Sequence, residues 1–265
     1  MKITALIENT TARDDCVAEF GLSFLIEANG RHVLFDAGQS GKIAENAQVL
    51  GIDLAAIDTA ALSHGHYDHA NGFSRFFEVN TQATLYVRRG YDGDYWAERG
   101  EYIGVAPELV GRERLAVIED ERTDLGDGFF LLSYAGREPA LPIEPFGLFR
   151  KEGGKLVSDE FLHEQYLLVV EGKIRLLVTG CSHRGIRNIL HWSAEERPTH
   201  VLGGFHLFKS PLDDPALLDA AADGLLAYPA HYITCHCTGL DQYRYLKERM
   251  GDRLEYIAAG QTIEL

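Results

Sequence analysis

The sequence predicts an α/β protein in which two mixed β-sheets pack face to face between outer layers of helices, an αββα sandwich. Three observations support this prediction. Each half of the chain contains apolar strand patterns, each half then alternates strand and helix patterns, and no repeat, low-complexity tract or linker separates the halves. Because the halves are similar in kind, we expect one domain over residues 1–265.

The N-terminal half starts with strands and continues with strand–helix alternation. Asn29-Gly30 is the strongest hairpin signal, and Ser40 is predicted to cap a helix that Gly51 ends. The elements expected here are strands over Lys2–Asn9, Phe20–Ala28 and Arg31–Asp36, a helix over Ser40–Leu50, a strand over Ala60–Ser63, a short helix over Phe73–Phe77 and a strand over Ala83–Val87.

Two long irregular segments occupy the middle of the chain, on either side of a strand over Gly128–Tyr134. The segment Arg88–Arg114 carries Tyr91, Tyr95, Trp96 and Tyr102, and long loops of this kind often serve as lids or binding loops. The segment Leu141–Glu164 is expected to be a connection that contains the turn signal Gly153-Gly154.

The C-terminal half repeats the order of strands and helices. Glu171-Gly172-Lys173 is expected to join the first two strands as a hairpin. The expected elements are strands over Leu167–Val170 and Ile174–Val178, a helix over Gly185–Trp192, a strand over His200–His206, a helix over Asp213–Leu226, a strand over Tyr232–Thr234, a helix over Leu240–Met250 and short strands over Leu254–Ala258 and Thr262–Leu265.

Charge and composition exclude several classes of partner. The formal charge of −15 argues against general binding to nucleic acid or to anionic membranes, since both require a basic surface. The four cysteines do not form a disulfide framework for a chain of 265 residues. The sequence also lacks a signal-peptide core and an apolar run of about 20 residues, so we expect a cytoplasmic protein. It gives no indication of oligomeric state.

A dense group of possible metal ligands directly follows the predicted strand Ala60–Ser63. His64, His66, Asp68 and His69 lie within six residues. Imidazole and carboxylate are ligands that suit zinc, iron or manganese. Because exposed loops rarely concentrate such residues, the group predicts a metal site at the end of a strand.

Three later strands also end near a histidine, namely His183, His206 and His236. Strand ends on one edge of a sheet converge in space, so we expect these side chains to meet the first group. The remaining histidines lack this context and are assigned no role: His32, His163, His191, His200 and His231.

These motifs resemble the signature of the metallo-β-lactamase fold superfamily. The matching motifs are Asp-Ala-Gly at Asp36, His-x-His-x-Asp-His at His64–His69, and the single histidines His183 and His236. Further motifs are similar to a branch of that superfamily related to dihydropterin-methyl-ribofuranosyl-aminobenzene-phosphate synthase. They are Glu8-Asn9-Thr10, Thr179–Ile186, Gly203–Leu207, His236–Gly239 and Ala259–Leu265.

The resemblance implies a ligand set. One metal would be held by His64, His66 and His183, and a second by Asp68, His69 and His236, while Asp36 would orient ligands without binding metal. Most superfamily members carry a bridging aspartate where this chain has His206. An imidazole cannot bridge two metals as a carboxylate does, so His206 is either a ligand or a group that acts on the substrate. Glu8 is a further candidate to face the site.

The leading hypothesis is a metal-dependent hydrolase that acts on a small ester-type molecule, either a phosphate ester, a lactone or a thioester. One or two divalent ions, with zinc first and iron or manganese as alternatives, would generate hydroxide at neutral pH. Asp68 would orient the nucleophile, and His206 or Glu8 would handle the leaving-group proton. The alternatives are an enzyme of pterin-cofactor assembly with a phosphorylated or pterin-like substrate, and a metal-containing binding protein without turnover. In the enzyme of pterin-cofactor assembly, the aromatic loop around Tyr91, Trp96 and Tyr102 would stack a flat ring.

Overall fold

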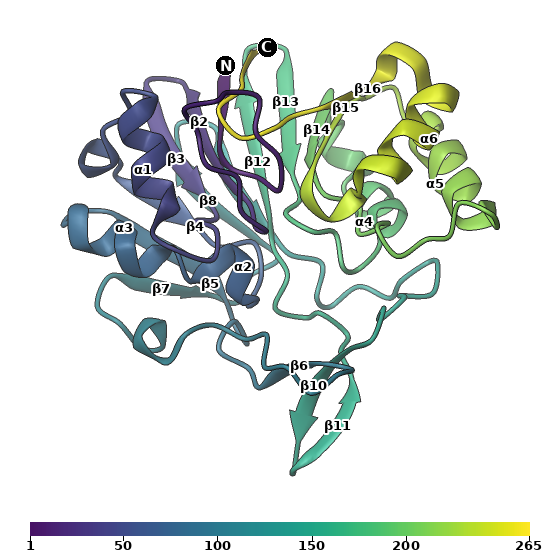
Figure 1. Cartoon of the computed structure of the whole chain (residues 1–265), viewed down its shortest axis with the longest axis horizontal. Helices are drawn as coiled ribbons and strands as arrows, with labels where there is room; N and C mark the ends of the chain where they lie inside the picture. The colour runs from purple at the N-terminus through teal and green to yellow at the C-terminus, as the bar shows by residue number, and fades with distance from the viewer.

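Two seven-stranded sheets form the middle of the molecule in a computed structural model that describes residues 1–265 (Figure 1). The first sheet comes from the N-terminal half and the last strand of the chain. Its strands are β1 (Lys2–Ile7), β2 (Ser23–Ala28), β3 (Arg31–Phe35), β4 (Thr59–Ala61), β5 (Thr84–Arg88), β7 (Leu115–Ile118) and β17 (Thr262–Glu264). They are arranged in the order β17-β1-β2-β3-β4-β5-β7, antiparallel up to β3 and parallel from there on.

The second sheet comes from the C-terminal half and is also mixed. Its strands are β8 (Arg122–Gly126), β9 (Phe129–Leu132), β12 (Tyr166–Glu171), β13 (Ile174–Val178), β14 (His200–Gly203), β15 (His231–Thr234) and β16 (Leu254–Tyr256). The order is β16-β15-β14-β13-β12-β9-β8, parallel from β13 to β16 and antiparallel elsewhere. Each sheet thus places a run of parallel strands beside a run of antiparallel ones.

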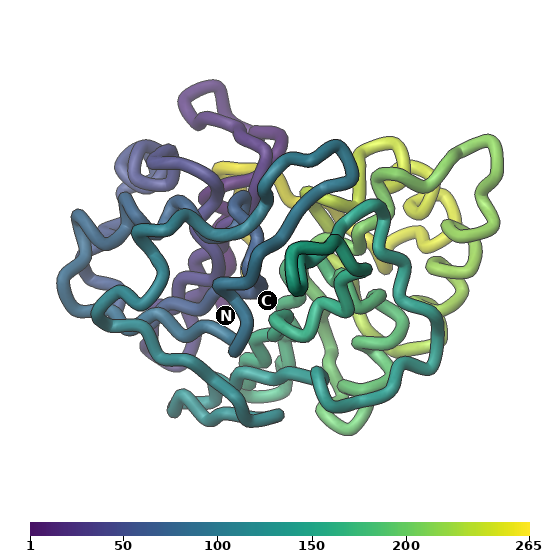
Figure 2. Tube along the Cα trace, turned by 90° about the horizontal axis from the view of Figure 1, so that it is seen from below, coloured from purple at the N-terminus to yellow at the C-terminus, as the bar shows by residue number.

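Helices cover the outer face of each sheet. The helices are α1 (Lys42–Val49), α2 (Tyr67–Ala70), α3 (Phe73–Val79), α4 (Ile186–Trp192), α5 (Ala216–Leu226) and α6 (Leu240–Met250), and short 3-10 helices cover Leu54–Ala56, Pro107–Leu109, Ala194–Glu196, His236–Thr238 and Gly251–Arg253. None of the helices is long and apolar enough to cross a membrane. Figure 2 shows the N-terminal half, in purple to blue, beside the C-terminal half, in green to yellow.

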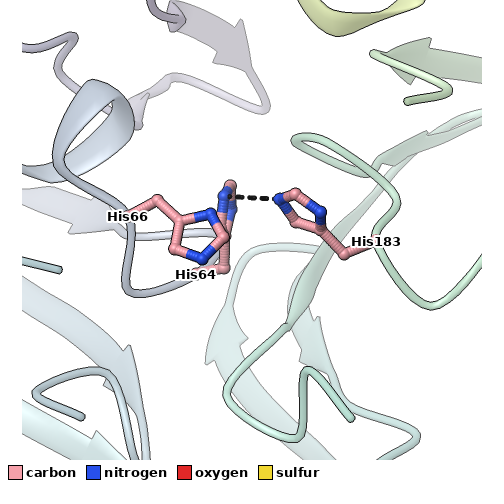
Figure 3. A group of neighbouring side chains, drawn as sticks. All are labelled: His64, His66 and His183. Atoms are coloured by element: carbon pink, nitrogen blue, oxygen red, sulfur yellow. Dashed lines mark hydrogen bonds between the residues drawn. The ribbon is translucent and has the colours of Figure 1, made fainter. Parts of the chain in front are cut away.

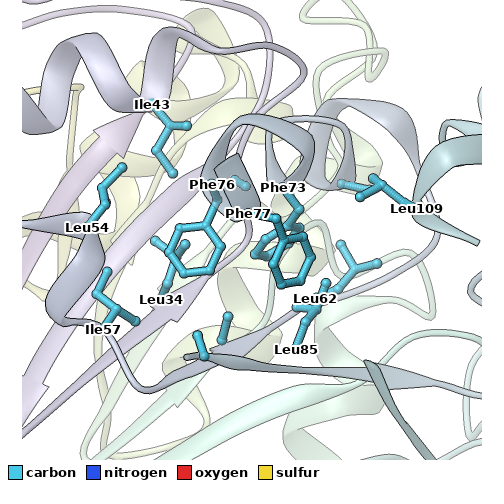
Figure 4. Packing of buried hydrophobic residues seen from close by; sticks show 14 of the residues in the cluster. Leu34, Ile43, Leu54, Ile57, Leu62, Phe73, Phe76, Phe77, Leu85 and Leu109 are labelled. Carbon is cyan, nitrogen blue, oxygen red and sulfur yellow. The ribbon is translucent and has the colours of Figure 1, made fainter. Parts of the chain in front are cut away.

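Apolar packing separates the molecule into four layers. Phe73, Phe76 and Phe77 of α3 pack with Ile43 of α1 onto Leu34 of the first sheet (Figure 4). A second cluster fills the space between the sheets, and two further clusters lie between the second sheet and α4–α6. The layers therefore run helix, sheet, sheet, helix, which confirms the predicted αββα sandwich.

The predicted hairpins are confirmed. Ala28 pairs with Arg31 across Asn29-Gly30, and Glu171 pairs with Ile174 across the second turn. The prediction of Ser40 as the cap of α1 is wrong. Gly41 occupies the cap position and has no side chain with which to cap the helix, while the Ser40 hydroxyl, one residue earlier, donates to Glu19 Oε2 at 2.6 Å and accepts from the Lys42 N–H at 3.3 Å.

A small third sheet was not predicted. It consists of β6 (Tyr95–Ala97), β10 (Leu148–Glu152) and β11 (Lys155–Ser158), in the order β11-β10-β6. The last two strands form a hairpin on Gly153-Gly154 that projects from the sandwich (Figure 1). The two segments expected to be irregular therefore pair with each other, over Arg150↔Tyr95 and its neighbours.

Candidate metal centre

The predicted site residues meet at one edge of the sandwich, where parallel strands of both sheets end. In α/β sheets, ligands bind outside the carboxyl ends of the strands. Asp36 directly follows β3 and the His64–His69 cluster follows β4, while His183, His206 and His236 follow β13, β14 and β15. The sandwich thus brings side chains that are more than a hundred residues apart into one site.

Backbone conformation at these strand ends is unusual. Asp36, Ser182, His206 and His236 all have positive φ angles, of 60°, 59°, 52° and 47°. Non-glycine residues seldom adopt this region, and such residues are held there by surrounding structure at a cost of about 1–3 kcal/mol each. Four of them around one site indicate that the fold keeps its side chains in positions that local preference would not select.

The first donor set consists of His64, His66 and His183. His64 and His66 come from the loop after β4, and His183 faces them from the other half of the molecule (Figure 3). Nε2 of His64 lies 3.1 Å from Nε2 of His183. The His66 ring centroid lies 4.6 Å from that of His64 and 4.8 Å from that of His183. All three side chains are buried.

The second donor set consists of Asp68, His69 and His236. Nε2 of His69 lies 3.3 Å from Nε2 of His236. Asp68 Oδ2 lies 3.7 Å from the first of these nitrogens and 3.3 Å from the second. Two halves of the chain therefore contribute to this set as well.

In three of the rings, those of His64, His69 and His236, a hydrogen bond on the far side determines which nitrogen carries the proton. His69 Nδ1 donates to Asp36 Oδ2 at 2.6 Å, and His236 Nδ1 donates to Asn9 Oδ1 at 2.8 Å. The Ser63 hydroxyl donates to the same Asp36 oxygen at 2.7 Å and so accepts from His64 Nδ1 at 2.8 Å. When these three rings are neutral, Nε2 therefore carries a lone pair, and it points into the centre.

This arrangement fits divalent metal ions. Two nitrogens bound to one tetrahedral zinc at its usual bond length lie about 3.3 Å apart. The Nε2–Nε2 separations of 3.1 and 3.3 Å are close to that value, whereas neutral acceptors without a donor between them would repel each other. In addition, Nε2 of His66 is buried without a hydrogen-bond partner.

Burial and charge set the protonation of the two sets differently. Burial holds the pKa of His64 and of His183 well below the ordinary value and lowers the pKa of His66 to about 3. These rings are therefore neutral at pH 7 and ready to bind metal. Burial would also lower the pKa of His69, but the adjacent Asp36 and Asp68 carboxylates outweigh it and raise the pKa to about 9. A proton occupies the second set in the absence of metal.

His206 lies beside the first set and has no hydrogen bonds. It is 7% exposed, neither ring nitrogen has a partner, and its ring centroid lies 4.3 Å from that of His183. A buried imidazole without partners costs free energy and calls for a ligand or substrate contact. It lines both a cavity at the metal centre and a neighbouring cleft.

Glu8 lies under the centre and is fully buried. Oε1 accepts from the His236 backbone N–H at 2.6 Å and from the Tyr256 hydroxyl at 2.7 Å, while Oε2 accepts two hydrogen bonds from Thr10. Four donors occupy the carboxylate, so the geometry argues against the expected role of Glu8 in proton transfer to a leaving group. It instead fixes the loop that carries His236.

Sequence reasoning missed His163, which was assigned no role. The residue is 2% exposed, its Nδ1 accepts from the Gly65 N–H at 2.9 Å, and its Nε2 donates to Asp159 Oδ2 at 3.1 Å. It thereby supports the loop between His64 and His66. No strand ends at His163, so the pattern that identified the other histidines could not find it.

The aromatic side chains Tyr91, Trp96 and Tyr102 do not form the binding surface that the sequence predicted. Tyr91 is buried in the apolar core below α3, and Trp96 packs against Tyr102 with ring centroids 5.5 Å apart. None of the three lines the cavity at the metal centre, which measures about 130 Å³. Its apolar wall consists of Phe20, Ile103, Leu148 and Phe208.

A neighbouring cleft of about 180 Å³ continues from this cavity past His183 and His206. It is lined by apolar side chains such as Phe146, Leu207 and Leu217, and the positively charged side chain of Arg187 also lines it. The two hollows share the two histidines, so the cleft borders the first donor set at His183.

Comparison with known proteins agrees with the geometry. The family model of the metallo-beta-lactamase superfamily matches residues 17–155. An uncharacterized protein of Methanocaldococcus jannaschii is 32% identical over 246 residues, which cover 89% of this chain and 90% of that protein. The 7,8-dihydropterin-6-methyl-4-(beta-D-ribofuranosyl)-aminobenzene-5'-phosphate synthase of the same organism is 28% identical over 267 residues, covering 93% and 90%.

Among solved structures, Tm1679, described as a metal-dependent hydrolase of the beta-lactamase superfamily, has a TM-score of 0.83 and 29% sequence identity to this chain. The alignment covers 100% of this chain and 99% of that one. The likeness therefore extends over both sheets and both helical layers.

Proposed function

Because the chain belongs to the metallo-β-lactamase superfamily, we propose that it is a metal-dependent hydrolase that cleaves an ester-type bond of a small molecule. The substrate class is a phosphate ester, a lactone or a thioester. The observation that carries the proposal is the convergence of two donor sets, one from His64, His66 and His183 and one from Asp68, His69 and His236, at metal-binding separations.

In this proposal each donor set holds one divalent ion. Zinc suits three imidazoles as well as the mixed imidazole–carboxylate set, and iron and manganese accept similar ligands. When bound, such ions activate a water molecule and polarise the carbonyl or phosphoryl oxygen of the substrate. The neutral state of His64, His66 and His183 favours binding at the first set without the release of a proton.

The protein supplies orientation and proton transfer. Asp68 is 7% exposed and lines the cavity, which supports a role for its carboxylate in accepting a hydrogen bond from the attacking water and orienting it toward the substrate. His206 lines the same cavity with both ring nitrogens free. We assign it the transfer of a proton to the leaving atom, where an imidazole is effective near neutral pH.

The shape of the site supports a small substrate with an apolar part. Phe20, Ile103, Leu148 and Phe208 surround the cavity and limit the access of water, which strengthens electrostatic interactions inside it. The scissile bond would lie in this cavity and the remainder of the substrate in the cleft beyond His206.

A second candidate is an enzyme of pterin-cofactor assembly. It is supported by the relative of 28% identity that is named as an aminobenzene-phosphate synthase. The cleft beside Phe146, whose ring centroid lies 5.0 Å from that of His206, would then take a flat ring. Equilibrium binding of pterins distinguishes the candidates, because the absence of affinity for any pterin would remove the second.

The direct test combines metal analysis with turnover. The purified protein is expected to contain up to two divalent ions per chain and to hydrolyse at least one member of a panel of phosphodiesters, lactones and thioesters. The substitution His183→Ala should abolish turnover, whereas His191→Ala, an exposed histidine on α4, should leave it unchanged. Full activity of metal-free protein would refute the proposal.

A further inference from the structure

Cys181 is a buried cysteine that lies among the possible metal ligands. It follows β13, two residues before His183, and is 3% exposed. Its Sγ lies 3.1 Å from Nε2 of His69. A cysteine with a purely structural role packs like a small apolar residue. Cys235 does so in the cluster between the sheets, whereas the sulfur of Cys181 contacts a ring nitrogen of His69.

Cys181 lies close to donor atoms of both sets. Its Sγ lies within 4.8 Å of the donor atoms of His64 and His183 in the first set, and of His69 and His236 in the second. It also lies within this distance of the donor atom of His206. The sulfur atom is thus located between the two proposed ion positions.

Neither Asp68 nor His206 is well suited to link the two donor sets. Asp68 is the carboxylate of the second set, and its Oδ2 is directed to His69 and His236. His206 offers one lone pair from a neutral ring, so it binds one ion at most. A thiolate sulfur has several lone pairs, binds zinc at about 2.3 Å, and can contact two ions at once.

We propose that Cys181 is a metal ligand that lies between the two donor sets and links the two ions through its sulfur. The inference rests on the proposed metal centre and adds a ligand of different chemistry to it. With zinc bound to both atoms, Sγ and His69 Nε2 would lie about 3.6 Å apart, so the side chain has to move by only about 0.5 Å from its position.

The test uses the full chain loaded with cobalt(II) under anaerobic, reducing conditions. A cobalt–thiolate bond produces a sulfur-to-metal charge-transfer band in the near ultraviolet, which nitrogen and oxygen ligands do not. We expect this band in the wild-type protein and its loss in Cys181→Ser. Cys16→Ser is the matched control, because Cys16 is also a buried free cysteine but its sulfur packs beside Gly260, and it should keep the band. Persistence of the band in Cys181→Ser would overturn the inference.

Cys237 provides a sharper control. It lies in a group with Cys181 and His236 and is therefore the competing source of a thiolate. The band should remain in Cys237→Ser, and its loss there together with retention in Cys181→Ser would assign the ligand to Cys237. The variant Cys181→Asp should recover the binding of the second ion without the band, whereas Cys181→Ser should lower the affinity for that ion at least about tenfold.

X-ray absorption of the zinc-loaded wild-type protein tests the inference without any variant. A sulfur neighbour at about 2.3 Å supports it, and a shell of nitrogen and oxygen alone refutes it. In the latter case stoichiometric metal and turnover would still support the proposed hydrolase. Failure of the wild-type protein to bind any metal would refute both proposals.

Discussion

The substitution Asp36→Asn tests whether the residue below the cluster orients its ligands. Asp36 is fully buried and accepts three hydrogen bonds from two residues. Oδ1 accepts from the Ser63 N–H at 2.7 Å, and Oδ2 accepts from the Ser63 hydroxyl at 2.7 Å and from His69 Nδ1 at 2.6 Å. Asparagine keeps the shape of the side chain but replaces one acceptor oxygen with an NH₂ donor.

Either orientation of the asparagine amide harms the site. If NH₂ faces His69, the ring must accept at Nδ1 and carry its proton on Nε2, the atom that would bind metal. If NH₂ instead faces the Ser63 N–H, two donors meet in a buried position, which costs about 1–3 kcal/mol. Loss of such orienting partners typically lowers metal affinity about 10–100-fold, or about 1.4–2.7 kcal/mol.

The measurement is a competition titration of the second ion against a chelator of known affinity. Asp58→Asn is the matched control, because Asp58 is exposed and precedes β4 at the end away from the centre. Equal affinity in Asp36→Asn and in the wild-type protein, with the fold intact by circular dichroism, would refute the reasoning about the tautomer of His69.

The remaining predictions concern metal, backbone space and protons. Chelation should lower the melting temperature by about 5–10 °C relative to protein with ions at 100 times their dissociation constant, which adds about 2.7 kcal/mol. Gly65→Ala should reduce metal content and melting temperature, because the added Cβ would collide with the Tyr91 carbonyl oxygen. Gly136→Ala is the control: its Cβ would meet no atom within 4 Å, so this variant should melt like the wild-type protein. His163→Phe leaves the Gly65 N–H without its acceptor and should cost about 1–3 kcal/mol in urea unfolding, more than His163→Asn, which keeps an acceptor oxygen. His69 has a pKa of about 9 in the folded metal-free protein, so the free energy of unfolding of that protein, measured in urea, should fall as pH rises from about 6.5 to 9. The affinity for the second ion should rise over the same pH range, because the proton on His69 competes with the metal. If neither quantity changed with pH, the raised pKa of His69 would be contradicted.

The sequence was most informative where local chemistry and fold agree. Asn29-Gly30 and the second hairpin follow from turn preferences, and α6 has the predicted bounds Leu240–Met250. The convergence of His183 and His236 with the first cluster was predictable because each follows a strand. Parallel strands of one sheet present these ends at a common edge, and the packing of the two sheets brings the edge that carries His183 and His236 to the cluster after β4 of the other sheet.

Other features depend on contacts that no local pattern contains. His163 lies in a loop, and its position is set by a hydrogen bond to Gly65, nearly a hundred residues earlier. The hairpin of β10 and β11 pairs with β6 across about fifty residues of chain. Glu8 has the pattern of an exposed residue at the end of a strand, and only the fold surrounds its carboxylate with donors.

The origin of the donors in both halves has a consequence for variants far from the site. His64 and His183 follow strands of different sheets, so the apolar layer between the sheets determines the distance between their nitrogens. A core substitution that moves one sheet by a few tenths of an ångström would change metal affinity while the chain remains folded. The metal content of a purified variant therefore reports sensitively on the packing distance between the two sheets.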